Sequence, residues 1–268
     1  MQIKYRTWEN APPPRPIKLE IPGWAGHHRR HDNGCIPQPW HCVPFVEGAT
    51  YGLEIIYPFE HETRVTNENG NCVFSGKFFE KDYDTSAMPI PFSNFAPGHY
   101  GFTSSVDLKI PEDHVIRLEP HPRFFTDTTG TCPIAIPGHI QSWWCRIFFM
   151  VFKAPLSQQT HIFTQGEPVA QILIVPKKAN YEIEEMNQEE ILERIFVDNK
   201  IAELDKVLPK HSWKDYLGNQ FDDKYKQLQA IYNKNGMNGI LSTLKKLCDK
   251  EHAKSRIKII GRYVKKIK

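Results

Sequence analysis

Proline is the feature that most restricts how this chain can fold, because nearly all of its 21 prolines precede residue 178. Proline lacks a backbone N–H and has a fixed φ, so it interrupts helices and central strands. Residues 1–178 are therefore expected to form short strands separated by many turns. Short strands at this spacing favour a sandwich or barrel over alternating strands and helices.

The front region carries clear strand and turn signals. The pair Asn69-Gly70 is typical of a tight hairpin. The apolar run at residues 148–152 predicts a strand that is covered on both faces. The clearest strand segments are YGLEIIYPF, VTNENGNCVFSG, DHVIRLEPH, RIFFMVFKAP and EPVAQILIVPKK. We therefore expect residues 1–178 to form a mainly β domain, a distorted β-barrel or jelly roll of the dUTPase-like or cupin-like kind.

From Tyr181 onward the apolar residues recur at helical spacing. Asn187 and Glu190 resemble a capping box at the start of a helix. Ser212 is expected to cap a short helix that ends at Gly218. Two further helices are expected, separated by the sequence NKNG, and their apolar stripes should face a core. Residues 181–268 are thus predicted to be a C-terminal helical extension.

The bulk composition is that of a globular protein, with 268 residues, 40% of them hydrophobic and 24% charged, and a net charge of +3. No stretch approaches the roughly 18 apolar residues that a membrane helix needs. The N-terminal sequence lacks the apolar core of a secretory signal. The six cysteines form no CxxC pair. These features favour a cytoplasmic protein with reduced thiols.

Residues 26–42, GHHRRHDNGCIPQPWHC, concentrate side chains that can bind metals. The candidate ligands for iron or zinc are His28, His31, Cys35 and His41. The run matches no established ligand spacing, and its two arginines disfavour an incoming cation. It fits an anion-binding arm as well, and a proline-containing surface loop is the preferred interpretation.

A second polar segment, RLEPHPRFFTDTTGTCPIAIPGHIQSWWCRIFF, is the more suggestive of a small-molecule site. An arginine and an aspartate beside histidines can hold an anionic group and transfer a proton. The candidate catalytic residues are His121, Arg123, Asp127 and His139. In the alternative interpretation, Arg123 and Asp127 only stabilise a turn.

The same segment supplies candidate substrate-binding residues, which are Gln141, Trp143 and Arg146. Paired tryptophans can line a pocket for a flat or cationic ligand. On a strand, however, Trp143 and Trp144 would point to opposite faces, so only one of them could line a given cavity.

The last residues, 254–268, run from Lys254 to Lys268 with seven basic side chains and no acid. Such a run can bind nucleic acid or another acidic partner by charge alone. The alternatives are a solubilising tail and an edge strand that is protected by lysines.

Three segments between residues 40 and 178 resemble an uncharacterised bacterial family that is known only as a domain of unknown function. The matching motifs are Cys42 to Phe45, then Gly52-Leu53-Glu54, and Gly166-Glu167-Pro168 before the last strand. The family has an aromatic residue where this chain has Leu53. The resemblance implies no established activity.

The order of strands and turns is also similar to the distorted β-barrel of dUTPases and dCTP deaminases, with Gly138 and Gln171 at matching positions. The chemistry of that family does not carry over. Its phosphate-binding serines are missing beside Arg123, its water-activating aspartate is missing between His139 and Ser142, and RIFFMVF lacks the deaminase glutamate.

The leading hypothesis is a protein that binds a small molecule in or at the mouth of its β domain, leaning towards a cytoplasmic, metal-assisted enzyme on a polar or anionic substrate. The helical extension could cover the site or form a homodimer. One alternative is a non-catalytic interaction protein that uses residues 254–268. Another is a nucleotide-binding relative of dUTPases that lacks the usual hydrolytic mechanism.

Overall fold

The computed structural model describes residues 1–8, 11–18, 43–86, 89–127, 129–204, 208, 212–214, 218 and 220–251. In these ranges, the residues up to Asn180 other than Val43 form one compact unit, and Val43 and the residues from Tyr181 belong to another; each unit is described by itself. None of the described helices is long and apolar enough to cross a membrane. The predicted metal ligands His28, His31, Cys35 and His41, and the basic residues 254–268, lie outside the described residues.

The largest sheet of the first unit has five strands in the order β10-β9-β13-β3-β2, and every neighbouring pair is antiparallel. Its strands are β2 (Arg15–Pro16), β3 (Leu53–Ile56), β9 (His114–Pro120), β10 (Gly138–Gln141) and β13 (Pro168–Pro176). The central strand β13 joins β3 to β9.

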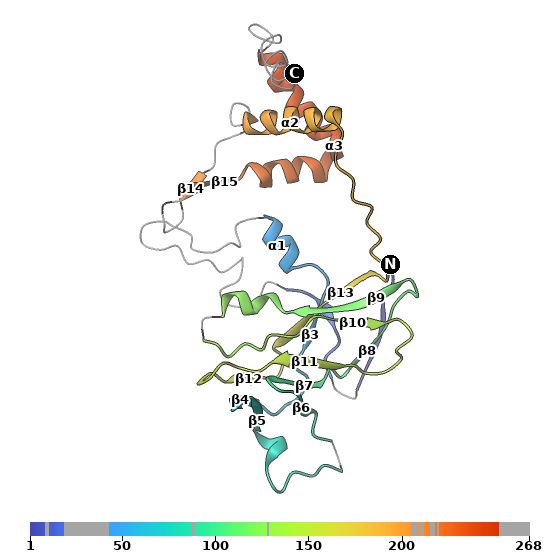
Figure 1. The fold of residues 1–268 in the computed structure, drawn as a ribbon, viewed down its shortest axis with the longest axis vertical. Coiled ribbons are helices and arrows are strands. Elements are labelled where there is room, and N and C mark those ends of the chain that lie inside the picture. Colours follow the sequence, from blue (N-terminus) through green and yellow to red (C-terminus); the bar gives the residue numbers. More distant parts are fainter. Residues whose placement is uncertain are drawn as a thin grey trace. The chain divides into compact units, whose positions relative to one another are not determined.

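Smaller sheets complete the first unit, with the orders β11-β7-β6, β12-β4-β5 and β1-β8. Their strands are β1 (Lys4–Thr7), β4 (Thr63–Glu68), β5 (Asn71–Ser75), β6 (Phe92–Ala96), β7 (His99–Thr103), β8 (Val106–Lys109), β11 (Phe149–Lys153) and β12 (His161–Phe163). The short helices are α1 (Val43–Ala49), η2 (Lys77–Phe79) and η3 (Pro122–Thr126). In Figure 1, β3, β9, β10 and β13 form one layer, and β7, β11, β12 and β4 lie beneath it.

An aromatic core fills the space between these layers. Phe102 of β7 stacks on Phe92 of β6 with ring centroids 4.8 Å apart and on Phe152 of β11 at 5.4 Å. The five-stranded sheet contributes aliphatic side chains to the same cluster, including Leu118 and Ile172. Large rings of this kind bury much apolar surface each, so this core accounts for most of the packing of the unit.

Two local predictions can be compared directly with the strands. The hairpin at Asn69-Gly70 is confirmed: β4 pairs with β5, and both turn residues have the positive φ that such a turn requires. The prediction that residues 148–152 are covered on both faces is wrong. Met150 and Phe152 are buried, but Phe149 is 39% exposed, as in a strand with only one face on the core.

The second unit is built around two helices, α2 (Gln188–Ala202) and α3 (Lys224–Glu251). The capping box is confirmed, because Asn187 accepts the Glu190 backbone N–H while the Glu190 carboxylate accepts that of Asn187. A small core around Leu204 and Leu244 joins the helices. The non-helical Gly236 interrupts α3, which matches the predicted break at NKNG.

Other predictions for this unit are wrong. Ser212 does not cap a helix, because β14 (Ser212–Lys214) pairs with β15 (Gln220–Asp222) as a small hairpin. The apolar stripe of α2 is also not fully buried, since Ile195 is 37% and Phe196 is 53% exposed. Periodicity identifies which face of a helix is apolar, but it does not show that something covers that face.

The mainly β fold with a C-terminal helical region is thus confirmed. The strand pairing leaves separate sheets, and no closed barrel forms among the described residues. The polar side chains near the five-stranded sheet therefore lie on a covered sheet face, rather than in the interior of a barrel.

Candidate functional site

A row of polar side chains crosses the five-stranded sheet on the face that points away from the aromatic core. The strand register places Arg15 opposite Glu54, Glu54 opposite Gln171, and Gln171 opposite Glu119. Their neighbours in sequence, such as Leu118 and Ile172, point into the core. Because side chains alternate along a strand, the four polar residues share the opposite face.

Glu54 is the centre of this row and is fully buried. Arg15 donates a hydrogen bond to one of its carboxylate oxygens, and His121 Nε2 lies 3.3 Å from the other. Burial alone would raise the pKa of Glu54, but the hydrogen bonds from His121 and Arg15 outweigh it and hold the pKa below its usual value. Glu54 is therefore a buried carboxylate that is charged at neutral pH and satisfied by its partners.

His121 lies between β9 and η3 and is 1% exposed. Burial lowers the pKa of His121, and the hydrogen bond with Glu54 only partly offsets this effect, so the imidazole is neutral at neutral pH. Its Nδ1 accepts the backbone N–H of Arg123 at 3.2 Å, while Nε2 faces Glu54. Both ring nitrogens thus have protein partners.

Arg123 and Asp127 continue from this cluster along η3. Arg123 Nη1 donates to Glu167 at 2.9 Å. Burial raises the pKa of the nearby Cys132 thiol, and the Arg123 guanidinium opposes this effect only in part. Asp127 accepts hydrogen bonds from Thr129 and from the backbone of Cys132. Burial would raise the pKa of Asp127, but these bonds outweigh it and lower the pKa. Asp127 therefore stabilises a turn.

The predicted residues of β10 lie along β9 and apart from the His121 cluster, with His139 opposite the middle of β9 and only Gln141 near its start. His139 is exposed on β10 opposite Arg117, and Gln141 pairs with Val115 near the start of β9. His121 follows the other end of β9. A seven-residue strand separates these ends by about 20 Å. The structure thus joins His121 to Arg123, with Asp127 nearby, and places His139, Gln141 and the turn after Gln141 elsewhere.

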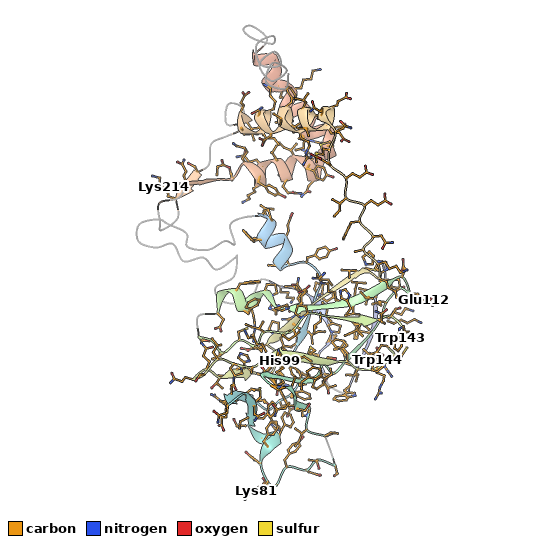
Figure 2. All side chains as sticks on the ribbon, viewed as in Figure 1. Lys81, His99, Glu112, Trp143, Trp144 and Lys214 are labelled. Carbon is orange, nitrogen blue, oxygen red and sulfur yellow. The ribbon has the colours of Figure 1, made fainter. Side chains whose placement is uncertain are left out.

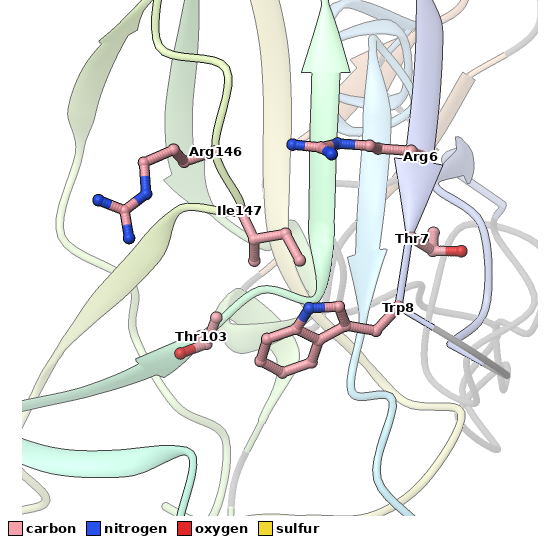
Figure 3. Close-up of a pocket in the computed structure, with 6 residues that line it drawn as sticks. All are labelled: Arg6, Thr7, Trp8, Thr103, Arg146 and Ile147. Carbon is pink, nitrogen blue, oxygen red and sulfur yellow. The ribbon is translucent and has the colours of Figure 1, made fainter. Parts of the chain in front are cut away.

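At the Gln141 end, a pocket of about 460 Å³ opens beside β1. It is lined by Arg6, Thr7, Trp8, Thr103, Arg146 and Ile147. Figure 3 shows Arg6, on β1, and Trp8, directly after it, on the side of Ile147 and Thr103, while Thr7 points the other way. One predicted substrate-binding residue, Arg146, is therefore a wall of a pocket.

The two arginines of the pocket differ in their partners. Arg6 donates from Nε to Asp107 at 2.7 Å and from Nη2 to the backbone oxygen of Cys145 at 3.0 Å. Arg146 forms no ion pair within the described part of the chain, and its guanidinium carbon lies 5.7 Å from the centroid of the Trp144 ring. The pocket therefore contains one neutralised and one unneutralised cation.

The two tryptophans do not lie on a strand, contrary to the expectation that they point to opposite sheet faces. β10 ends at Gln141, and Trp143 and Trp144 follow in a turn, 67% and 39% exposed. Their ring centroids are 5.8 Å apart in an edge-to-face arrangement. Gln141 Oε1 is buried beside this turn without a hydrogen-bond partner in the described residues.

The sequence analysis missed several residues of the polar row around Glu54 and of the pocket beside β1. Glu54 had a signal, since an acid inside the apolar run LEII needs a buried partner or a charged surface. Arg15 and Trp8 had none, because only the strand pairing brings them to these positions. Within the described ranges, no group of three or more histidine, cysteine or acidic side chains could hold a metal ion.

Comparison with known proteins leaves the function open. No family model matches the sequence, so the resemblance to an uncharacterised bacterial family gains no support, and no curated protein matches it either. Among solved structures, native EIAV dUTPase is 7% identical, with 70% of this chain and 98% of that chain covered and a TM-score of 0.35. The dUTPase from phage phi11 of S. aureus is 14% identical, with coverage of 70% and 99% and a TM-score of 0.35. These values define a weak likeness of fold and carry no functional argument.

Proposed function

We propose that this protein binds a small molecule with an anionic group next to a planar apolar part, in the pocket beside β1. The observation that carries the proposal is that Arg146, which has no acidic partner in the described residues, lines the same pocket as the Trp8 indole. An arginine that is not neutralised binds carboxylates and phosphates well.

The other lining groups support this chemistry. Trp8 is 43% exposed, so part of its ring is available to a planar group. Thr103 adds a hydroxyl that can donate to an anionic oxygen. Arg6 is bonded to Asp107 and to the Cys145 backbone, so it forms a wall of the pocket whose charge is already neutralised. A charged group near Arg146 and a ring against Trp8 would use both parts of the site.

Phenyl phosphate is a suitable probe, with inorganic phosphate and phenol as its two halves. We expect phenyl phosphate to bind more tightly than either half when binding is measured by isothermal titration calorimetry. Arg146→Ala should weaken binding at least about tenfold, as expected for loss of a charged hydrogen bond. Arg64→Ala is the matched control, because Arg64 lies on β4, away from the pocket, where it pairs with Glu62. Equal binding by Arg146→Ala and the control would overturn the proposal.

The geometry supports binding more directly than catalysis. His121, the best placed of the predicted catalytic residues, has both ring nitrogens bonded within the protein, which leaves no nitrogen for a substrate proton. A metal-assisted cytoplasmic enzyme is a more specific version of this proposal. It requires a metal bound by His28, His31, Cys35 and His41. Elemental analysis of the purified protein for iron and zinc tests it, and metal-free protein that binds neither ion would exclude it.

A further inference from the structure

We propose that a basic and aromatic face beside the pocket binds single-stranded nucleic acid. This face is defined here by Lys4, Lys109, Trp8, Trp143, Trp144 and Arg146. The inference rests on the proposed function in one respect, namely that the pocket would hold one phosphate of the strand.

The β1–β8 pair supplies the basic part of the face. Its register places Lys4 opposite Lys109 and Arg6 opposite Asp107, while Val106 and Leu108 point into the core. Alternation along β1 therefore puts Lys4 and Arg6 on the outer side, and Trp8 follows directly after the strand with 43% of its side chain exposed. Like charges directly opposite each other destabilise a strand pair. An anion between Lys4 and Lys109 would relieve this repulsion, and the nearby Asp107 is already bonded to Arg6.

The turn after β10 supplies the aromatic part. Trp143 and Trp144 are 67% and 39% exposed, so large ring surfaces face water. The Arg6 bond to the Cys145 backbone fixes this turn to β1, and Arg146 connects Trp144 to the pocket. Exposed rings beside cations are the elements with which proteins bind single strands, since bases stack on the rings and phosphates meet the cations.

These features favour a single strand over other polyanions. The bases of a duplex already stack on each other and offer no free faces to tryptophan, whereas the bases of a single strand do. An acidic peptide would use the lysines and Arg146 but would leave the indole rings without aromatic partners. The exposed Glu112 lies on the same side as Trp143 in Figure 2 and would limit the face there by repelling phosphates.

The test is fluorescence anisotropy of labelled oligothymidylate of about 12 nucleotides with the full chain. The double variant Trp143→Ala/Trp144→Ala should weaken binding at least about tenfold. Glu112→Gln should tighten binding.

Phe125→Ala is the matched control, because Phe125 is an exposed ring (69%) on η3, at the other end of β9. This variant should leave binding unchanged. Raising salt from 50 to 200 mM should weaken binding roughly twentyfold if three phosphates are neutralised.

Any one of four outcomes would overturn the inference. The first is unchanged binding by the double variant. The second is loss of binding on deletion of residues 254–268 while the double variant still binds normally. The third is binding of duplex DNA or an acidic peptide that equals that of the oligonucleotide. Phenyl phosphate separates the two proposals, because Trp143 and Trp144 do not line the pocket. The fourth outcome is a protein that binds phenyl phosphate but no oligonucleotide, which would overturn this inference and leave the proposed function standing.

Discussion

At the scale of single residues, the buried carboxylate of Glu54 and the buried amide of Gln171 are satisfied by partners within the first unit. Glu54 is charged in the interior because Arg15 and His121 both contact its carboxylate. Gln171 donates to the backbone oxygens of Gly48 and Tyr51, and so fixes the end of α1 over the polar row. These residues determine the local structure, and the residues proposed to bind ligands lie elsewhere.

His161 makes a prediction about acid stability. Burial lowers its pKa from 6.5 to about 4, while its Nδ1 lies 2.8 Å from the Tyr100 hydroxyl. Between these two pH values the unfolded chain binds more protons than the folded one, so stability falls as the pH drops from 6.5 towards 4. We expect the free energy of unfolding, measured with urea at a series of pH values, to fall by on the order of 3 kcal/mol across this range.

The variant His161→Gln keeps a polar group that can bond to Tyr100 and removes the titration. Its stability should therefore change much less over the same pH range than that of the parent protein. An equal pH dependence in both proteins would show that other groups cause the acid sensitivity.

At the scale of elements, local signals worked where neighbouring residues alone determine the structure. The Asn69-Gly70 turn and the Asn187 capping box each depend on a few adjacent residues, and both were predicted. The strand at Ser212 was missed because pairing with β15, a later segment of the chain, overrode a local capping signal. Phe149 was expected to be buried, but whether a strand is covered depends on distant chain segments.

The capping box gives a prediction at this scale. Asn187→Ala removes the side chain that accepts the Glu189 and Glu190 backbone N–H groups. We expect a loss of about 1 kcal/mol in the stability of α2, measured by hydrogen exchange of its amides. Gln188→Ala is the control, since it changes the next residue without removing the cap. Equal protection in the two variants would contradict the assignment.

At the scale of the whole molecule, composition and periodicity predicted the mainly β front region and the helices that follow it. They did not predict the two sites, because each site joins residues that are far apart in the sequence. Arg6 reaches Cys145, and Arg15 reaches Glu54, only through strand pairing. Of the proposed pocket residues, Arg146 alone was selected from the sequence, as one member of the polar and aromatic segment that also contains Gln141 and Trp143.

The aromatic core lies entirely within the first unit, which leads to a prediction about truncation. A chain that ends at Asn180 should fold cooperatively, with near-UV circular dichroism and a single thermal transition, because it keeps every residue of that core. A truncated protein that keeps the far-UV circular dichroism of β-strands but has no near-UV signal would lack fixed packing. That result would show that the division near residue 180 does not separate independent folding units.

The short strand β2 has a consequence for how the protein behaves at high concentration. Ile17 donates to Gly52, so the preceding residue, Pro16, presents its backbone to the outer side of the sheet, where it has no N–H to offer. Among the described residues β2 is an edge strand of this sheet, and a strand from another molecule would find no N–H donor at Pro16. This imino acid therefore disfavours edge addition, the first step of fibril growth, at this position.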